Sequence, residues 1–200
     1  MGRRPTHALQ RHSAGIGNAC HDPRHTRHQA FAVRRIEEGK VARHCRARKI
    51  GTVGIHAINA VLYEKMTFDP TKDFTPISFL ASTPNVLIVN KQLGISNLHD
   101  LIELAKSQPN QLTFGSSGVG TSLHMSGELF KEMTGVQIRH IPYKGRAQSL
   151  PDLVSGRITM LFDNLSSSLP LIKAGEVQAL GVTSLKRSPA APEIPTLAEQ

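Results

Sequence analysis

The chain has 200 residues, of which 39% are apolar and only 4% aromatic, with no tryptophan. This composition fits an α/β domain with aliphatic packing and argues against an aromatic-rich β-sandwich. A net charge of +9 suggests a nucleic-acid-binding protein, but the charge is unevenly distributed. Residues 1–50 carry twelve Lys and Arg against three Asp and Glu, whereas residues 51–200 carry twelve of each. The basic character therefore belongs to the first quarter of the chain only.

Residues 1–50 show no pattern typical of a folded element. Their longest apolar run is the four residues 30–33, and no stretch alternates or repeats at helical spacing for long enough to bury a face. An export signal needs an apolar stretch of about 7–15 residues, and none follows Arg3-Arg4. We expect a disordered basic tail, and hypothesise that a shifted reading frame or a wrong start produced it. The chain as written would then be cytoplasmic by default.

Two functional interpretations of this tail remain as alternatives. A metal site could use its cysteines and histidines, but their spacings match no standard zinc pattern. A nucleic-acid-binding arm would need aromatic side chains or a basic helical face, and only Phe31 is available. We expect no nucleic-acid partner, although binding through the tail is the alternative function from a different class. The metal alternative would involve Cys20, His21, His25, His28, His44 and Cys45.

From Gly51 onward, strand and helix patterns alternate along the chain. Such alternation predicts an α/β fold with a mostly parallel sheet covered by helices on both faces. Pro151 and Pro170 fall inside two expected helices, so we expect those helices to begin later, near Leu150 and Leu169. The expected strands span residues 85–90, 111–116, 136–143, 157–162 and 177–182. The expected helices span residues 98–107, 122–133, 146–154 and 166–174.

A Ser- and Gly-rich corner, residues 116–122 (SSGVGTS), lies between an expected strand and an expected helix. Glycines allow a tight turn, and the helix start offers unpaired N–H groups and the positive end of the helix dipole. The corner could therefore bind a carboxylate, phosphate or sulfate. It is neither a Walker A motif nor a dinucleotide fingerprint. An ordinary capped turn is the alternative interpretation.

Other polar residues lie just after a strand or in the first turn of a helix. Asp163 and Lys144 come just after strands, where side chains of a parallel sheet tend to face a ligand crevice. His124 is expected in a first helical turn, where the dipole disfavours the charged imidazolium. Each could equally be a cap, a solvated turn residue or a plain packed histidine.

The ordered part of the sequence carries no catalytic motif. It has no GxSxG, no HExxH, no Cys–His pairing and no motif with paired carboxylates. This favours binding over turnover, so we expect a protein that is not an enzyme and uses no cofactor or metal. A small enzyme dependent on His124 or Asp163 is a third possibility.

Several motifs in order resemble the receptor family of tripartite tricarboxylate transporters (Bug/TctC). The resemblance covers essentially all of residues 51–200. The motifs are GTVGIHAIN at 51–59, LY at 62–63, FDPTKDFTP at 68–76, TPNVLIVN at 83–90, GSSGVGTSLH at 115–124, IPYKG at 141–145, MLFDN at 160–164, IKAGEVQALGVTS at 172–184 and KRSPAAPEIPTLAE at 186–199.

The resemblance implies a periplasmic-binding-protein type II-like fold, in which two α/β lobes close on a ligand. Residues 51–84 would be a remnant of the first lobe, and residues 85–184 a nearly complete second lobe. Residues 185–200 would return toward the first lobe and be truncated there. The strands at 85–90 and 177–182 would be the two crossovers between lobes.

The resemblance also implies a function: a solute-binding receptor for a small di- or tricarboxylate, acting with membrane components of a transporter. The intact family is periplasmic, and we expect a monomer. Family members are longer than this match, so a non-functional truncated remnant is an alternative. The implied ligand-binding residues are Thr52 and His56 from the first lobe, Ser117, Gly118, Gly120, Thr121 and His124 from the second-lobe loop, and Asp163 for the rest of the ligand.

Overall fold

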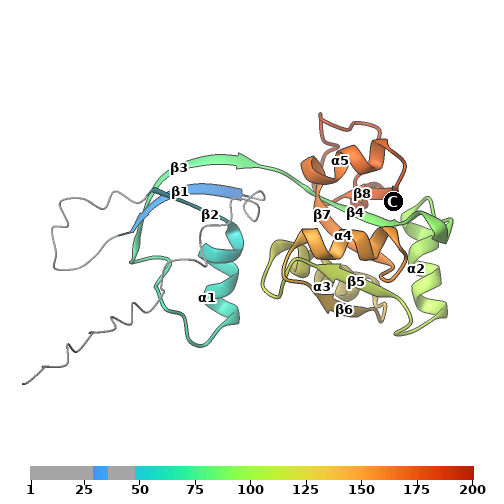
Figure 1. Cartoon of the computed structure of the whole chain (residues 1–200), viewed down its shortest axis with the longest axis horizontal. Helices are drawn as coiled ribbons and strands as arrows, with labels where there is room; N and C mark the ends of the chain where they lie inside the picture. The colour runs from blue at the N-terminus through green and yellow to red at the C-terminus, as the bar shows by residue number, and fades with distance from the viewer. Residues whose placement is uncertain (1–28, 36–47) are drawn as a thin grey trace, which may run out of the picture.

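The computed structural model describes the backbone of residues 29–35 and 48–200, and the tail cysteines and histidines considered above lie outside these residues. Two sheets organise the chain, joined where β3 leads into β4 (Figure 1). None of the helices in the described ranges has the length and apolar character needed to span a bilayer.

The smaller sheet is antiparallel and has the strand order β2-β1-β3. Its strands are β1 (Gln29–Arg35), β2 (Arg48–Gly51) and β3 (Phe74–Ser82). Between β2 and β3 lie a π-helical turn, η1 (Gly54–Ile58), and the short helix α1 (Asn59–Leu62). The structure thus has a strand at 29–35, where the sequence pattern predicted no regular element.

The larger sheet has the strand order β6-β5-β7-β4-β8. β5 is parallel to β6 and to β7, whereas β4 is antiparallel to both β7 and β8. Four strands therefore run in one direction and β4 alone in the other, which confirms the predicted mostly parallel sheet. The strands are β4 (Asn85–Asn90), β5 (Thr113–Ser116), β6 (Arg139–Pro142), β7 (Met160–Asn164) and β8 (Val177–Val182).

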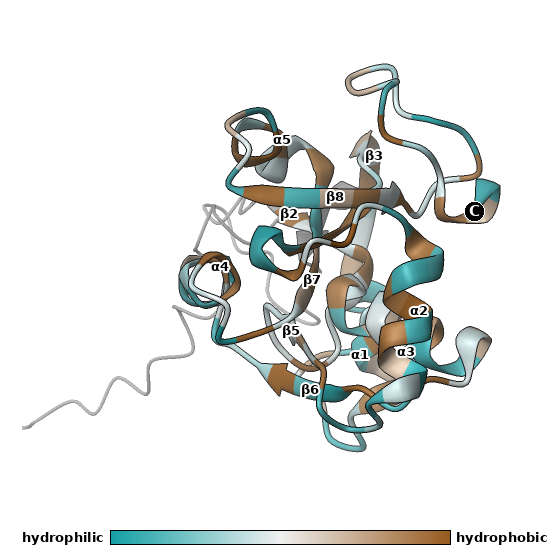
Figure 2. Ribbon diagram, turned by 90° about the vertical axis from the view of Figure 1, so that its right-hand side faces the viewer, coloured by the Kyte–Doolittle hydropathy of each residue, from teal (hydrophilic) through white to brown (hydrophobic). Residues whose placement is uncertain are grey.

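Helices cover both faces of this sheet, as predicted. Successive side chains of a strand point to opposite faces, so β4 sends Leu87 and Val89 into one core, and Val86 and Ile88 into the other. Figure 2 shows β7 between α4 on one side and α2 and α3 on the other. The helices are α2 (Leu98–Ser107) and α3 (Ser122–Thr134) over the first core, and α4 (Arg146–Val154) and α5 (Leu165–Lys173) over the second.

Helices α4 and α5 do not begin late, so the expected starts near Leu150 and Leu169 are wrong. Pro151 and Pro170 lie inside these helices. A proline removes its own N–H bond from the helix and crowds the preceding turn, but the turns around it can keep their hydrogen bonds. In α4, Ser155 N still donates to the Pro151 carbonyl at 2.9 Å, and burial of Leu153 holds the helix against the sheet.

Candidate functional site

Three loops meet at one edge of the larger sheet. β5, β6 and β7 are parallel, so their carboxyl ends lie at the same edge. The loop after β5 is tied to the loop after β6, because Tyr143 N donates to the Ser116 carbonyl at 3.0 Å. Asp163 and Asn164 end β7 at the same edge. The Ser- and Gly-rich corner and Asp163 are thus in the same region of the fold.

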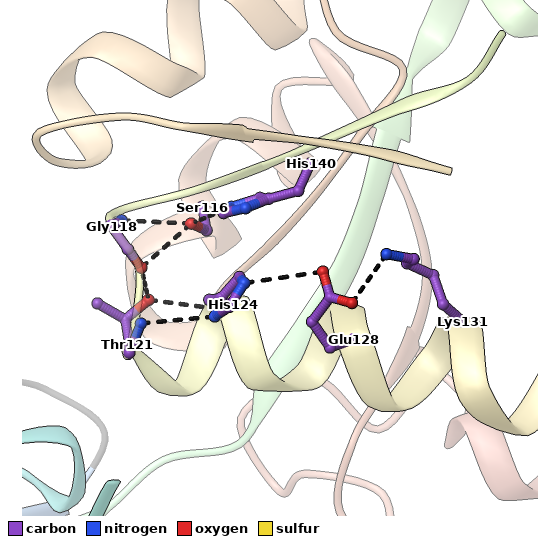
Figure 3. A network of polar contacts seen from close by, with 8 residues as sticks. Ser116, Gly118, Thr121, His124, Glu128, Lys131 and His140 are labelled. Carbon is purple, nitrogen blue, oxygen red and sulfur yellow. Dashed lines mark hydrogen bonds and ion pairs between the residues drawn. The ribbon is translucent and has the colours of Figure 1, made fainter. Parts of the chain in front are cut away.

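The corner is held by hydrogen bonds centred on Thr121, the N-cap of α3 (Figure 3). Thr121 Oγ1 accepts from His124 N at 3.3 Å and donates to the Gly118 carbonyl at 2.7 Å. Gly118 and Gly120 have φ values of 133° and 79°, which favour glycine. The remaining N–H groups of the first turn have no acceptor within the helix. A polar, electropositive corner results, and it can accept an anion.

The segment after β2 lies against this corner. A Cβ added at Gly54 would lie 3.2 Å from the Gly120 carbonyl, and one added at Gly120 would lie 2.7 Å from Asn59 Oδ1. Tyr63 Oη donates to the Val119 carbonyl at 3.5 Å. The glycines permit this close approach. Asn59 and Tyr63 were missed as site residues, since they appeared in the sequence only as parts of family motifs.

Thr52 and His56 lie in this segment, but the structure gives them local roles. The Thr52 carbonyl accepts from Ile55 N and from His56 N, each at 3.1 Å. The His56 ring covers Gly51 and stands edge-on to Phe74, with 5.3 Å between ring centroids. Burial lowers the pKa of His56, which favours the neutral ring.

Beside the corner, His124 belongs to a cluster that the sequence did not reveal. Its Nδ1 accepts from Gly120 N at 3.4 Å, and its Nε2 lies 3.7 Å from Glu128 Oε1. The ring of His140, on β6, lies 4.3 Å from the ring of His124. Burial, together with His124, lowers the pKa of His140 to about 4, so His140 is neutral at pH 7. His140 escaped notice because it sits inside a strand, sixteen positions from His124.

Asp163 is 1% exposed and already holds two donors. Arg146 Nε and Ser168 Oγ each donate to Asp163 Oδ2 at 2.5 Å, and Arg146 also donates to the Ser167 carbonyl at 2.8 Å. Asp163 Oδ1 is buried and has no hydrogen-bond partner among the described residues. One carboxylate oxygen is therefore structural and the other lacks a donor. Arg146 had no signal in the sequence, because its partner is seventeen residues away.

A cavity of about 340 Å³ lies elsewhere, near the start of β8. Its lining includes Lys91, Gly175 and Glu193. Lys91 follows the end of β4 and Gly175 precedes β8, so the cavity is at the opposite edge of the sheet from the corner. It brings together none of the predicted site residues.

Residues 50–200 match the model of the tripartite tricarboxylate transporter family receptor, TctC. Among curated relatives, a UPF0065 protein from the tcbD-tcbE intergenic region of Pseudomonas sp. (strain P51) is 36% identical over 150 residues, covering 75% of this chain and 44% of the relative. BugT of Bordetella pertussis is 32% identical over 143 residues, covering 72% and 44% respectively.

Solved structures of carboxylate-bound proteins also match this chain. R. palustris Rpa4515 with adipate has a TM-score of 0.72 and 48% sequence identity, over 74% of this chain and 50% of the other. MatC from Rhodopseudomonas palustris with bound malate has a TM-score of 0.68 and 27% identity, with the same coverage.

The fold is therefore that of a periplasmic solute-binding protein. The chain belongs to the tripartite tricarboxylate transporter receptor family, a periplasmic family of solute-binding proteins. It spans about half the length of the relatives it matches.

Proposed function

We propose that the chain is part of a solute-binding receptor that captures a small dicarboxylate or tricarboxylate at the start of α3. The observation that carries the proposal is the corner at residues 117–124, with the segment at residues 54–63 lying directly against it. A helix N-terminus with nearby hydroxyls and glycines attracts a carboxylate through its dipole and its unpaired N–H groups.

In this proposal one ligand carboxylate accepts from the backbone N–H groups of Ser122 and Leu123 and from the Ser117 hydroxyl. Gly118, Gly120 and Thr121 shape the corner, and the ring of His124 contributes a further hydrogen-bonding group beside it. Thr52, just before the facing segment, and His56, within it, hold the shape of that segment.

Asp163 is proposed to recognise the far end of the ligand through Oδ1, which is buried without a donor among the described residues. A hydroxyl or amino group of the ligand would supply that donor. Because Oδ2 is held by Arg146 and Ser168, Oδ1 is the oxygen left to accept from the ligand.

Similarity to receptors solved with adipate and with malate supports the ligand class. We further propose that residues 85–184 are the second lobe and residues 51–84 a part of the first. The protein would work as a monomer in the periplasm, deliver its ligand to transporter components in the membrane, and catalyse no reaction.

Isothermal titration calorimetry of the full chain against adipate, malate, citrate, glutamate and nicotinate tests the proposal. We expect heat from at least one carboxylate. Ser117→Ala should weaken that binding about tenfold or more, because a hydrogen bond to a charged group contributes about 1.5–3 kcal/mol. Ser155→Ala, at the far end of α4, is the matched control. Absence of heat from every carboxylate would overturn the proposal.

A further inference from the structure

Three potential metal ligands converge beside α3. His124 and Glu128 are four residues apart on this helix, so they lie on the same face, and His140 approaches from β6 (Figure 3). One ligand atom from each of the three side chains lies within 4.8 Å of the others. All three side chains are partly buried. The sequence hides this set, because a helix and a neighbouring strand bring it together.

The donor set suits one class of metal ion. Two imidazoles and one carboxylate are ligands that zinc accepts, with bonds of about 2.0–2.2 Å, and three protein ligands leave a fourth position open. The separation of 3.7 Å between His124 Nε2 and Glu128 Oε1 is close to what two ligands on one tetrahedral ion require. Small side-chain movements would bring the other ligand atoms, now within 4.8 Å of one another, to the separations that one ion requires.

Neighbouring residues already orient the side chains of His140 and Glu128, as residues around the ligands do in metal sites generally. Ser116 Oγ lies 2.8 Å from His140 Nε2, and the His140 ring stacks on Phe114 with 4.7 Å between centroids. Lys131 Nζ binds Glu128 Oε2 at 2.8 Å, which leaves Oε1 for a metal. The charge of Lys131 opposes a cation, so the affinity should be below that of a four-ligand structural zinc site.

We propose that His124, Glu128 and His140 bind a divalent transition-metal ion of the zinc type. Ligation through His124 Nε2 places the ring proton on Nδ1. Nδ1 can then no longer accept from Gly120 N, so metal binding frees this N–H group in the corner at residues 117–124. The metal site therefore adjoins the proposed carboxylate site but exists independently of it.

Calorimetric titration of the chelator-treated full chain with ZnCl₂, repeated on variants, tests this site. Residues of the tail can also take up zinc, so the decisive quantity is the difference between variants and wild type. Glu128→Gln and His140→Asn should each remove one zinc site or weaken it at least about tenfold. The matched controls Glu132→Gln, one turn further along α3, and His99→Asn, exposed on α2, should leave zinc binding unchanged.

Cobalt provides a second readout, because Co²⁺ in the same site should give visible absorption bands that Glu128→Gln abolishes. Circular dichroism of each variant establishes that it remains folded. The proposal is overturned if folded Glu128→Gln and His140→Asn bind zinc with wild-type stoichiometry and affinity. Carboxylate titrations with chelator present separate this outcome from failure of the proposed receptor function.

Discussion

Asn90, the last residue of β4, connects this strand to the end of α4 and to the turn at Gln92 through one buried side chain. Its Nδ2 donates to the carbonyls of Leu153 and Val154 at 2.6 and 3.0 Å, and its Oδ1 accepts from Gln92 N at 2.7 Å. Carbonyls in the last turn of a helix lack i+4 partners. The Leu153 carbonyl also accepts from Gly156 N at 3.1 Å, and the Asn90 side chain adds a donor to both carbonyls where water has little access. Among the described residues, two buried side-chain oxygens depart from this rule and have no hydrogen-bond partner: Asp163 Oδ1 and Asn164 Oδ1.

Tyr143 gives a residue-scale prediction on pH. Burial, together with a 2.8 Å hydrogen bond to Asp152, raises the pKa of Tyr143 to about 12, whereas an unfolded tyrosine has a pKa of about 10. Below pH 10 both states keep the proton, so this stabilisation is fully present. As pH rises from about 10 to about 12, the unfolded state loses its proton first and stability falls.

Urea unfolding of wild type and Tyr143→Phe at several pH values from 9 to 11.5 measures this effect. The stability advantage of wild type over the variant should shrink as pH rises through this range. Parallel stability curves for the two proteins would contradict the assigned pKa shift.

At the scale of elements, α3 is the helix on which both proposed sites depend. Thr121 caps its start, and Gly135, with φ 71°, ends it. Its buried positions are Leu123, Gly127 and Phe130. Gly127 is where the helix meets β5, because a Cβ there would overlap the ring of Phe114, which is fully buried. The missing side chain sets how closely α3 packs on the sheet.

Gly127→Ala should therefore destabilise the protein, although alanine is the better helix former by about 1 kcal/mol. Overpacking a rigid core costs about 1–3 kcal/mol, and the Phe114 ring is fully buried and stacked on His140. Chemical denaturation should show a net loss of stability. Glu132→Ala, at an exposed position of the same helix, should be nearly neutral. Equal stability of Gly127→Ala and wild type would show that α3 can shift away from the sheet.

At the scale of the whole molecule, residues 54–63, which lie between two strands of the smaller sheet, contact the corner before α3 on the larger sheet. Gly54 and Gly120 allow the segment at residues 54–63 to reach the corner before α3, with Leu62 and Tyr63 close to Gly120. Contact of this kind is sensitive to the addition of even one methyl group.

Gly120→Ala tests the contact, with Gly135→Ala as its matched control. Both glycines have similar positive φ values, 79° and 71°, so both substitutions carry a similar backbone cost of about 1–2 kcal/mol. Only at Gly120 would the new Cβ meet atoms of Asn59 and Leu62, at 2.7 and 2.9 Å; nothing lies within 4 Å at Gly135.

Hydrogen exchange should therefore show faster exchange at residues 54–63 in Gly120→Ala than in Gly135→Ala. Denaturation should show the larger loss of stability for Gly120→Ala. If both variants exchange alike at residues 54–63, the contact between the segment and the corner does not form in solution.

Local sequence patterns predicted the bounds of those strands and helices whose apolar pattern runs without interruption along the element. The bounds predicted for the strands at 85–90 and 177–182 and for the helix at 98–107 agree with β4, β8 and α2. β6 is shorter than the predicted strand at 136–143, because its alternation is only partial. The proline rule misplaced the starts of α4 and α5, since tertiary packing tolerates the loss of one N–H bond.

The sequence by itself determined the family, the alternation of strands and helices, and the Ser- and Gly-rich corner, because each depends on residues adjacent in the chain. Only the tertiary structure decided that β4 runs against its neighbours. It also placed Arg146 on Asp163, His140 beside His124 and Glu128, and Asn59 and Tyr63 against the corner. These relations join residues far apart in sequence, and their energies come from burial and hydrogen bonding that exist only after the sheet has formed.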